Sequence, residues 1–167
     1  LAKTLFENYG YRVVDLGVMT PLQSYIDAAK EHGADAIGMS ALLVQTSNHM
    51  ITVSKMMLEQ GLERMPVLIG GAPVNDRHAA YVAMAGDRDL EHMRGNVFYC
   101  PTAMDGVNVM NGLKSATDPE SVYAANKARL ASRFERAERM ARENEELLAK
   151  LPRRRIAFNG SPPSAGP

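Results

Sequence analysis

Residues 66–85 have the sequence PVLIGGAPVNDRHAAYVAMA, which predicts a strand, a glycine turn and a helix in succession. Pro66–Ile69 is a short apolar run of the kind that forms a buried strand, and Gly70-Gly71 ends it. A helix is predicted for about Asp76–Ala85. A strand followed at once by a helix is part of a βαβ unit, so this stretch predicts an α/β fold.

The same order of elements recurs on both sides of this stretch. Further strands are predicted at 11–16, 36–40 and 96–100, and further helices at 1–8, 21–32, 46–60 and 103–113. Strands that alternate with helices indicate a parallel sheet with right-handed crossovers. In such sheets ligands bind beyond the carboxyl ends of the strands. Topology therefore places the candidate site in four loops, at 17–20, 40–46, 70–75 and 101–103.

The character of the chain changes after Ser115. A helix is predicted over 118–151, and at 1.5 Å per residue it would be roughly 50 Å long, too long for a crossover in a compact domain. Its charges alternate in sign, so we expect it to extend away from the domain and not to join the core, although an apolar stripe led by Leu130 and Phe134 could dock its first half. The last residues are rich in proline, arginine and glycine, which is typical of a disordered linker. We therefore expect three parts: a domain at 1–116, a charged helix at 117–151 and a disordered segment at 152–167.

Composition excludes several classes of function. Lys+Arg and Asp+Glu number 19 each, so the formal net charge is zero and no long-range field would attract nucleic acid or an anionic membrane. The apolar runs are far shorter than the roughly 20 residues that span a bilayer. Cys100 is the single cysteine, so no internal disulfide can form, and no secretory signal is visible. We expect a cytoplasmic protein with no nucleic-acid or membrane partner.

Four segments resemble signatures of one known family. They are Val14-Asp-Leu-Gly-Val-Met-Thr-Pro21, Gly38-Met-Ser-Ala-Leu42, Val67-Leu-Ile-Gly-Gly-Ala-Pro73 and the strand-to-helix turn at 99–107. In their order and spacing they resemble the cobalamin-binding domain of corrinoid methyltransferases, over residues 1–113. The resemblance implies a Rossmann-like fold of the flavodoxin type, in which helices flank a parallel sheet.

The resemblance also implies how the cofactor, cobalamin, would be held. In the family the nucleotide tail of cobalamin inserts beside the sheet, and a histidine from an Asp-x-His-x-x-Gly motif replaces it on cobalt. That motif is absent here, so we expect an N-terminally truncated domain without its first, central strand. None of His32, His49, His78 and His92 fits the motif, so no metal ligand is assigned. Whether the chain binds cobalamin without that segment stays open.

Eleven residues are the expected cofactor contacts. They are Asp15, Gly17, Ser40, Leu42, Val44, Gly70, Gly71, Ala72, Tyr99, Thr102 and Ala103. Glycines without a Cβ let backbone approach a bulky ligand, Ser40 offers a hydroxyl to a tail nitrogen, and Leu42 offers an apolar wall. Val44 stands where methionine synthases have a threonine. Simpler roles remain open: a cap for Ser40, a turn for Asp15 and for the glycine pair, and a helix cap for Thr102.

The function that the resemblance implies is methyl transfer with methylcobalamin as carrier. No residue needs to act as acid, base or nucleophile, because the cofactor carries the chemistry. The module alone is expected to be inactive and to need methyl-donor and methyl-acceptor domains or subunits and a reactivation domain or protein. The long charged helix favours a methionine synthase-like module that methylates homocysteine. The alternatives are a corrinoid protein of a methanol or methylamine system, an adenosylcobalamin mutase domain and a non-catalytic cobalamin sensor.

Overall fold

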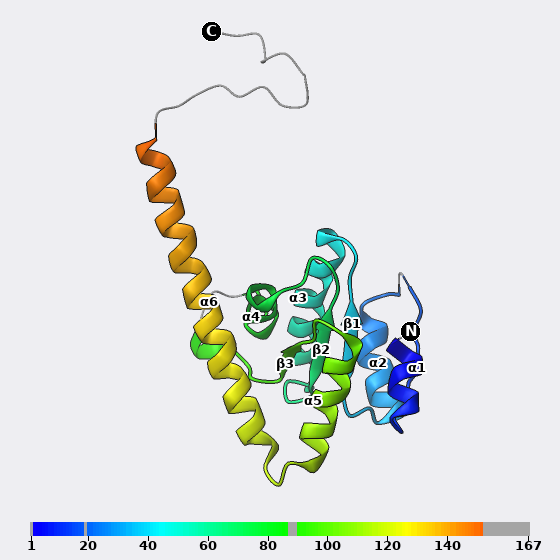
Figure 1. Cartoon of the computed structure of the whole chain (residues 1–167). Coiled ribbons are helices and arrows are strands. Elements are labelled where there is room, and N and C mark those ends of the chain that lie inside the picture. The colour runs from blue at the N-terminus through cyan, green and yellow to red at the C-terminus, as the bar shows by residue number, and fades with distance from the viewer. Residues whose placement is uncertain (1, 19, 87–89, 152–167) are drawn as a thin grey trace, which may run out of the picture. The chain divides into compact units, whose positions relative to one another are not determined.

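The computed structural model describes residues 2–18, 20–86 and 90–151 (Figure 1). Backbone contacts divide the chain into two units, residues 1–135 and 136–167. The helices are α1 (Ala2–Asn8), α2 (Gln23–His32), α3 (Val44–Glu59), α4 (Asp76–Ala83), the short 3-10 helix η1 (Leu90–His92), α5 (Ala103–Ser115) and α6 (Pro119–Lys150). The strands are β1 (Ile37–Ser40), β2 (Val67–Gly70) and β3 (Val97–Tyr99). The predicted alternation of strands and helices is confirmed from residue 23 onward.

The three strands form one parallel sheet in the order β1-β2-β3. Ser40 is level with Gly70, and Ile69 is level with Tyr99, so the three carboxyl ends meet at one edge. The strand predicted for 11–16 is wrong, because these residues have no regular secondary structure and lie in no sheet. A strand is held by a ladder of hydrogen bonds to a neighbour, and the described part of the chain offers this segment no such neighbour.

Side chains alternate between the two faces of the sheet, as the pleat requires. On the first face Ile37, Val67, Ile69 and Val97 pack with α2, α3 and α4 in the main core. On the second face Leu68 and Phe98 pack against α1 and α5 in a smaller cluster. The strands thus lie between two sets of helices (Figure 1). This arrangement confirms the predicted Rossmann-like class.

The first half of α6 covers the outer edge of β3, near the amino end of the sheet. Leu130 is fully buried and Phe134 nearly so, both within the main core. The amide of Asn126 donates to the carbonyls of Gly95 at 2.9 Å and Val97 at 2.6 Å. A Cβ on Gly95 would lie 2.0 Å from the carbonyl oxygen of Tyr123, so α6 can approach this closely only because residue 95 is glycine. Residues up to 135 are therefore continuous with the core, so the expectation that this helix lies outside the core is wrong for its first half.

The second unit begins inside α6. From Arg139 to Leu151 every residue is exposed, including Met140, Leu147 and Leu148. The boundary predicted at residue 116, between the domain and the charged helix, stays a prediction. The segment at 152–167 lies outside the described residues. Within the described part of the chain, no helix is long and apolar enough to cross a membrane.

Candidate functional site

The carboxyl ends of the three strands are held together by close backbone contacts. The amide of Ala41 donates to the carbonyl of Gly70 at 3.1 Å. Gly71 has φ +119°, and a Cβ there would lie 1.9 Å from the carbonyl oxygen of Ala41. A Cβ on Gly70 would lie 2.7 Å from the carbonyl oxygen of Cys100. Because neither glycine has a Cβ, the backbone of Ala41 and of Cys100 can approach the pair closely. The positive φ of Gly71 agrees with the turn role that the sequence left open.

A small pocket of about 70 Å³ lies at the carboxyl end of β1. Its lining comes from the loop before α2, from α2, from the end of β1 and from α3: Thr20, Leu22, Tyr25, Met39, Ser40, Thr46, His49 and Met50. Ser40 is exposed, and among the described residues no hydrogen bond of its hydroxyl is found. The pocket therefore joins two of the four predicted loops and offers a free hydroxyl.

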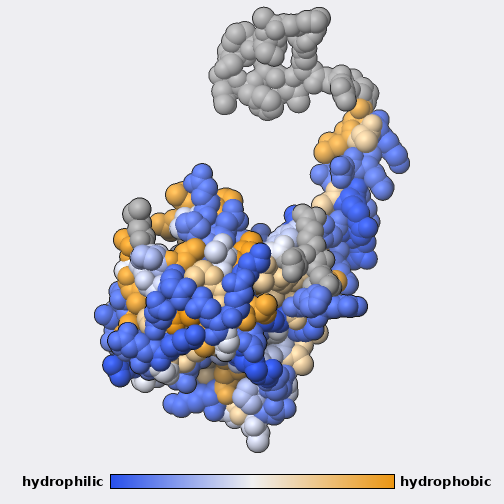
Figure 2. Space-filling view, turned by 180° about the vertical axis from the view of Figure 1, so that it is seen from behind, coloured by the Kyte–Doolittle hydropathy of each residue, from blue (hydrophilic) through white to orange (hydrophobic). Residues whose placement is uncertain are grey.

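Apolar side chains are exposed on the loop that follows β1. Leu42 is 83% exposed, Leu43 62% and Val44 67%, and Val18 in the preceding loop is 92% exposed. Figure 2 shows apolar surface reaching solvent among the blue polar surface of this unit. Burial of such side chains would be favourable, so a run of them in solvent is a candidate binding surface.

The second face of β1 is also uncovered. Gly38 is exposed, and a Cβ built on it would meet no atom within 4 Å. Its neighbour two residues on, Ser40, points to the same face and is exposed as well. By contrast, Leu68 and Phe98 on the next two strands are buried under α1 and α5. A flat ligand group could therefore lie on β1 without displacing a side chain.

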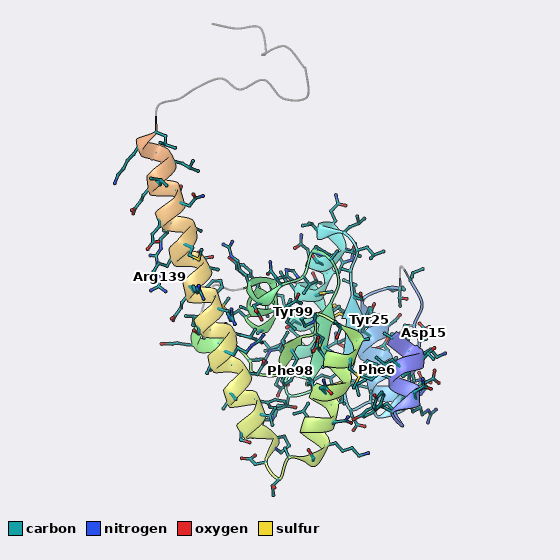
Figure 3. All side chains as sticks on the ribbon, viewed as in Figure 1. Phe6, Asp15, Tyr25, Phe98, Tyr99 and Arg139 are labelled. Carbon is teal, nitrogen blue, oxygen red and sulfur yellow. The ribbon has the colours of Figure 1, made fainter. Side chains whose placement is uncertain are left out.

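Asp15 and Gly17 form a turn of their own. The carboxylate of Asp15 accepts from the amide of Gly17 at 2.8 Å, and Gly17 has φ +79°. This is a tight turn closed by an aspartate, one of the two roles that the sequence left open. Figure 3 shows Asp15 at the outer side of the unit, well separated from Tyr99.

The residues that follow β3 are two strands away from β1, roughly 10 Å at the usual strand spacing. Tyr99 is half-buried against the main core. Thr102 forms a capping box with Asp105, which confirms its cap role, and Ala103 is the first residue of α5. Cys100 is buried, and desolvation raises the pKa of its thiol to about 11, with a smaller contribution from Asp105. A thiol that stays protonated at neutral pH is a poor nucleophile.

Four residues near these loops carry features that the sequence reasoning did not use. The helix predicted at 21–32 begins at Gln23, and the hydroxyl of Thr20 donates to the carbonyl of Leu16 at 2.6 Å. Tyr25 and His49 line the pocket (Tyr25 is labelled in Figure 3). His78 has its ring Nε2 2.9 Å from the carbonyl oxygen of Ser47, and burial lowers its pKa. Helical spacing places Tyr25 and Met50 on the inner faces of their helices, so it could have indicated the part of the pocket that α2 and α3 form. The contact of His78 with Ser47 joins residues 31 apart and has no local signal.

Comparison with known proteins identifies the family. The B12 binding domain family matches residues 1–89, more than half of the chain. The chain belongs to the B12-binding domain family. No group of three or more His, Cys, Asp or Glu side chains that could hold a metal is found among the described residues.

Two relatives and one solved structure show what this B12-binding domain is similar to. It is 33% identical to the methionine synthase of Mycobacterium tuberculosis over 144 residues, 85% of this chain and 12% of that protein. It is 35% identical to dimethylamine corrinoid protein 2 of Methanosarcina acetivorans over 80 residues, 47% of this chain and 37% of that protein. A crystal structure of a cobalamin-binding protein from Desulfitobacterium hafniense matches with TM-score 0.54 and 28% identity, over 66% of this chain and 48% of that one. The chain thus spans about an eighth of the methionine synthase that it matches.

The residues at the carboxyl end fit a corrinoid. A corrinoid combines a broad apolar macrocycle with polar amide and nucleotide groups. The exposed Leu42, Leu43 and Val44 provide apolar surface, and Ser40 provides a free hydroxyl. Gly38 leaves open surface beside that hydroxyl. These groups lie in one continuous part of the chain, residues 38–44.

Proposed function

We propose that this chain is the cobalamin-binding, methyl-carrying module of a corrinoid-dependent methyltransferase of the methionine synthase type. The observation that carries the proposal is the exposed, largely apolar surface at residues 38–44, in a domain of the B12-binding family. The exposed side chains of Leu42, Leu43 and Val44 belong to neither of the two hydrophobic clusters of the described residues. A bound corrinoid would cover them.

The role of the protein in this proposal is binding and orientation. Cobalamin supplies a cobalt centre that accepts and releases a methyl group, which is chemistry that no side chain performs. Ser40 would donate its hydroxyl proton to a nitrogen of the nucleotide tail, and Leu42 and Val44 would exclude water from the macrocycle edge. The contacts of Gly70 and Gly71 with neighbouring backbone hold the loops that carry these groups. None of these residues needs to change its protonation state.

The extent of the similarity supports the methionine synthase type over a small corrinoid protein. The match to methionine synthase covers 85% of the chain, so it extends beyond α5 into α6. The match to the dimethylamine corrinoid protein covers 47%. The sequence similarity to the first relative thus includes part of α6. Homocysteine as methyl acceptor, separate methyl-donor and acceptor modules and a reactivation partner belong to the proposal.

The proposal is tested by titrating the natural full-length protein with methylcobalamin while following the visible spectrum. We expect saturable binding at one site. Ser40→Ala should weaken binding roughly fivefold, the equivalent of one hydrogen bond. Leu147→Ser, which alters an exposed leucine in the second unit, should leave binding unchanged. A wild-type protein that does not bind methylcobalamin at all would contradict the proposal.

The cofactor form separates the proposed function from its rivals. The protein should bind methylcobalamin and transfer its methyl group to homocysteine when the acceptor-binding partner is present. A marked preference for adenosylcobalamin, without methyl transfer, would favour the mutase or sensor alternatives. Transfer to another acceptor but not to homocysteine would favour a corrinoid protein of the methylamine type.

A further inference from the structure

His78 connects the two loops that border the proposed site. It lies in the first turn of α4, just after the loop 71–75. Its ring Nε2 is 2.9 Å from the carbonyl oxygen of Ser47, in the first turn of α3. A carbonyl oxygen can only accept, so Nε2 carries the proton. This hydrogen bond therefore ties the start of α3 to the start of α4.

Both ends of this connection are fixed by their surroundings. The backbone amide of His78 donates to the side chain of Asn75 at 2.9 Å, which is the N-cap of α4. Ser47 is 2% exposed, and its hydroxyl donates to the carbonyl of Val44 at 2.6 Å. The imidazole therefore bridges two ordered helix starts and does not simply fill space.

The segment between residues 41 and 47 is held at both of its ends. At one end the backbone of Ala41 is held against Gly71. At the other end Ser47 is held by His78. The residues between them, 42–46, are all exposed, and the N-cap residue of α3, Leu43, makes no side-chain capping bond. A helix start without its own cap frays unless another group holds it.

We propose that His78 is a positioning residue of the cobalamin site. Its hydrogen bond to Ser47 holds residues 42–46 in the conformation that presents Leu42 and Val44 to the corrinoid. This inference rests on the proposed function. His78 itself acts through the segment and makes no contact with the cofactor.

The test compares three variants of the natural full-length protein. His78→Ala removes the donor, and His78→Gln keeps one, because the amide of glutamine can occupy the place of Nε2. Tyr123→Phe is the matched control: it removes another side-chain hydrogen bond to a backbone carbonyl, that of Arg64 at 3.2 Å, at the amino end of the sheet. His78→Asn, whose amide is too short to reach Ser47, replaces the alanine variant if that variant does not fold.

Two measurements are made on each variant. The first is amide hydrogen exchange of residues 47–51 without cofactor, which are the first amides of α3 with acceptors in the helix, and the second is the dissociation constant for methylcobalamin. For His78→Ala we expect faster exchange in this segment and binding weaker by roughly threefold to tenfold, the range of one lost hydrogen bond. His78→Gln should restore both, and Tyr123→Phe should change neither.

The outcomes separate this inference from the proposed function. Unchanged exchange at 47–51 in His78→Ala would overturn the inference whether or not cobalamin binds. Faster exchange with an unchanged dissociation constant would overturn the positioning role and leave the proposed function standing. Equal weakening in His78→Ala and Tyr123→Phe would reduce His78 to a general contribution to stability. A wild-type protein that binds no methylcobalamin would contradict the proposed function itself.

Discussion

The two ends of the sheet are completed differently. At the amino end α6 closes the structure: Asn126 satisfies the carbonyls of Gly95 and Val97, and Leu130 is fully buried. At the carboxyl end the strands stop at a surface where Leu42 and Val44 stand in solvent. A close glycine contact exists at both ends, but the first half of α6 covers the amino end, whereas residues 42–46 beyond the carboxyl end are all exposed. The comparison teaches that the amino end stabilises the fold while the carboxyl end is left available for a ligand.

The largest effect is expected at the amino end, from Leu130→Ala. Truncating a fully buried leucine removes its transfer free energy and leaves a cavity, so the free energy of unfolding should fall by about 3 kcal/mol. The melting temperature should fall by roughly 10 °C in a thermal scan. Met140→Ala, an exposed position on the same helix, should change it little. Equal losses for the two variants would contradict the division of α6 into a packed and an exposed half.

Gly38→Val tests the carboxyl end of the sheet. We expect its effect on the free energy of methylcobalamin binding to be similar in size to the effect of Leu130→Ala on the free energy of unfolding. A Cβ at residue 38 meets no atom of the protein, so the variant should fold as well as the parent. Its side chain would occupy the open surface beside Ser40, and we expect methylcobalamin binding to weaken by a factor on the order of 100. Gly112→Val, at another glycine with open space, should leave binding unchanged.

This variant is a cleaner probe than Gly71→Val. A valine at residue 71 would strike the backbone of Ala41 and would perturb folding whether or not a ligand binds nearby. If Gly38→Val binds methylcobalamin as tightly as the parent while remaining folded, the cofactor does not lie on this face of β1.

A smaller loss of stability is expected from Asn126→Ala. The substitution leaves the carbonyls of Gly95 and Val97 without the hydrogen bonds that Asn126 donates, and such losses cost about 2 kcal/mol. Urea denaturation should show a lower midpoint with an unchanged slope. Asn144→Ala, an exposed asparagine of the same helix, is the control. A stable Asn126→Ala variant would show that the contact of α6 with β3 contributes little.

The smallest effect concerns the pH dependence of stability near the site. Burial lowers the pKa of His78 below its ordinary 6.5, with the hydrogen bond to Ser47 opposing the shift. The unfolded chain then binds more protons than the folded one below pH 6.5, so the contribution of His78 to stability is present above that pH and is lost as the pH falls. The difference in unfolding free energy between the parent and His78→Gln should change in favour of the glutamine variant as the pH falls from 7.5 to 5.5. A difference that does not vary with pH would contradict the shift.

Much of the fold could be predicted from the sequence because its signals are local. Short apolar runs gave β1, β2 and β3, and helical spacing gave α3 to within two residues at its start. The strand expected at 11–16 failed because pairing depends on a neighbour, which β-branched residues in one segment cannot reveal.

The candidate site was predicted less completely, for a similar reason. Loop positions followed from topology, and Thr102 as a cap followed from its place before a helix. The contact of Gly71 with Ala41 and that of His78 with Ser47 each join residues about 30 positions apart, and only the folded chain brings them together. The roles of Ser40, Leu42 and the other expected contacts in binding stay predictions.

Hydrogen exchange with and without methylcobalamin tests the central claim most directly, because it locates the ligand on the domain. The account predicts slower exchange on binding in residues 38–46, 70–75 and 99–103, at the carboxyl end of the sheet. Residues 63–66 and 94–97, at the amino end, should exchange at the same rate in both states. Protection confined to the amino end, or none at all despite bound methylcobalamin, would contradict the account.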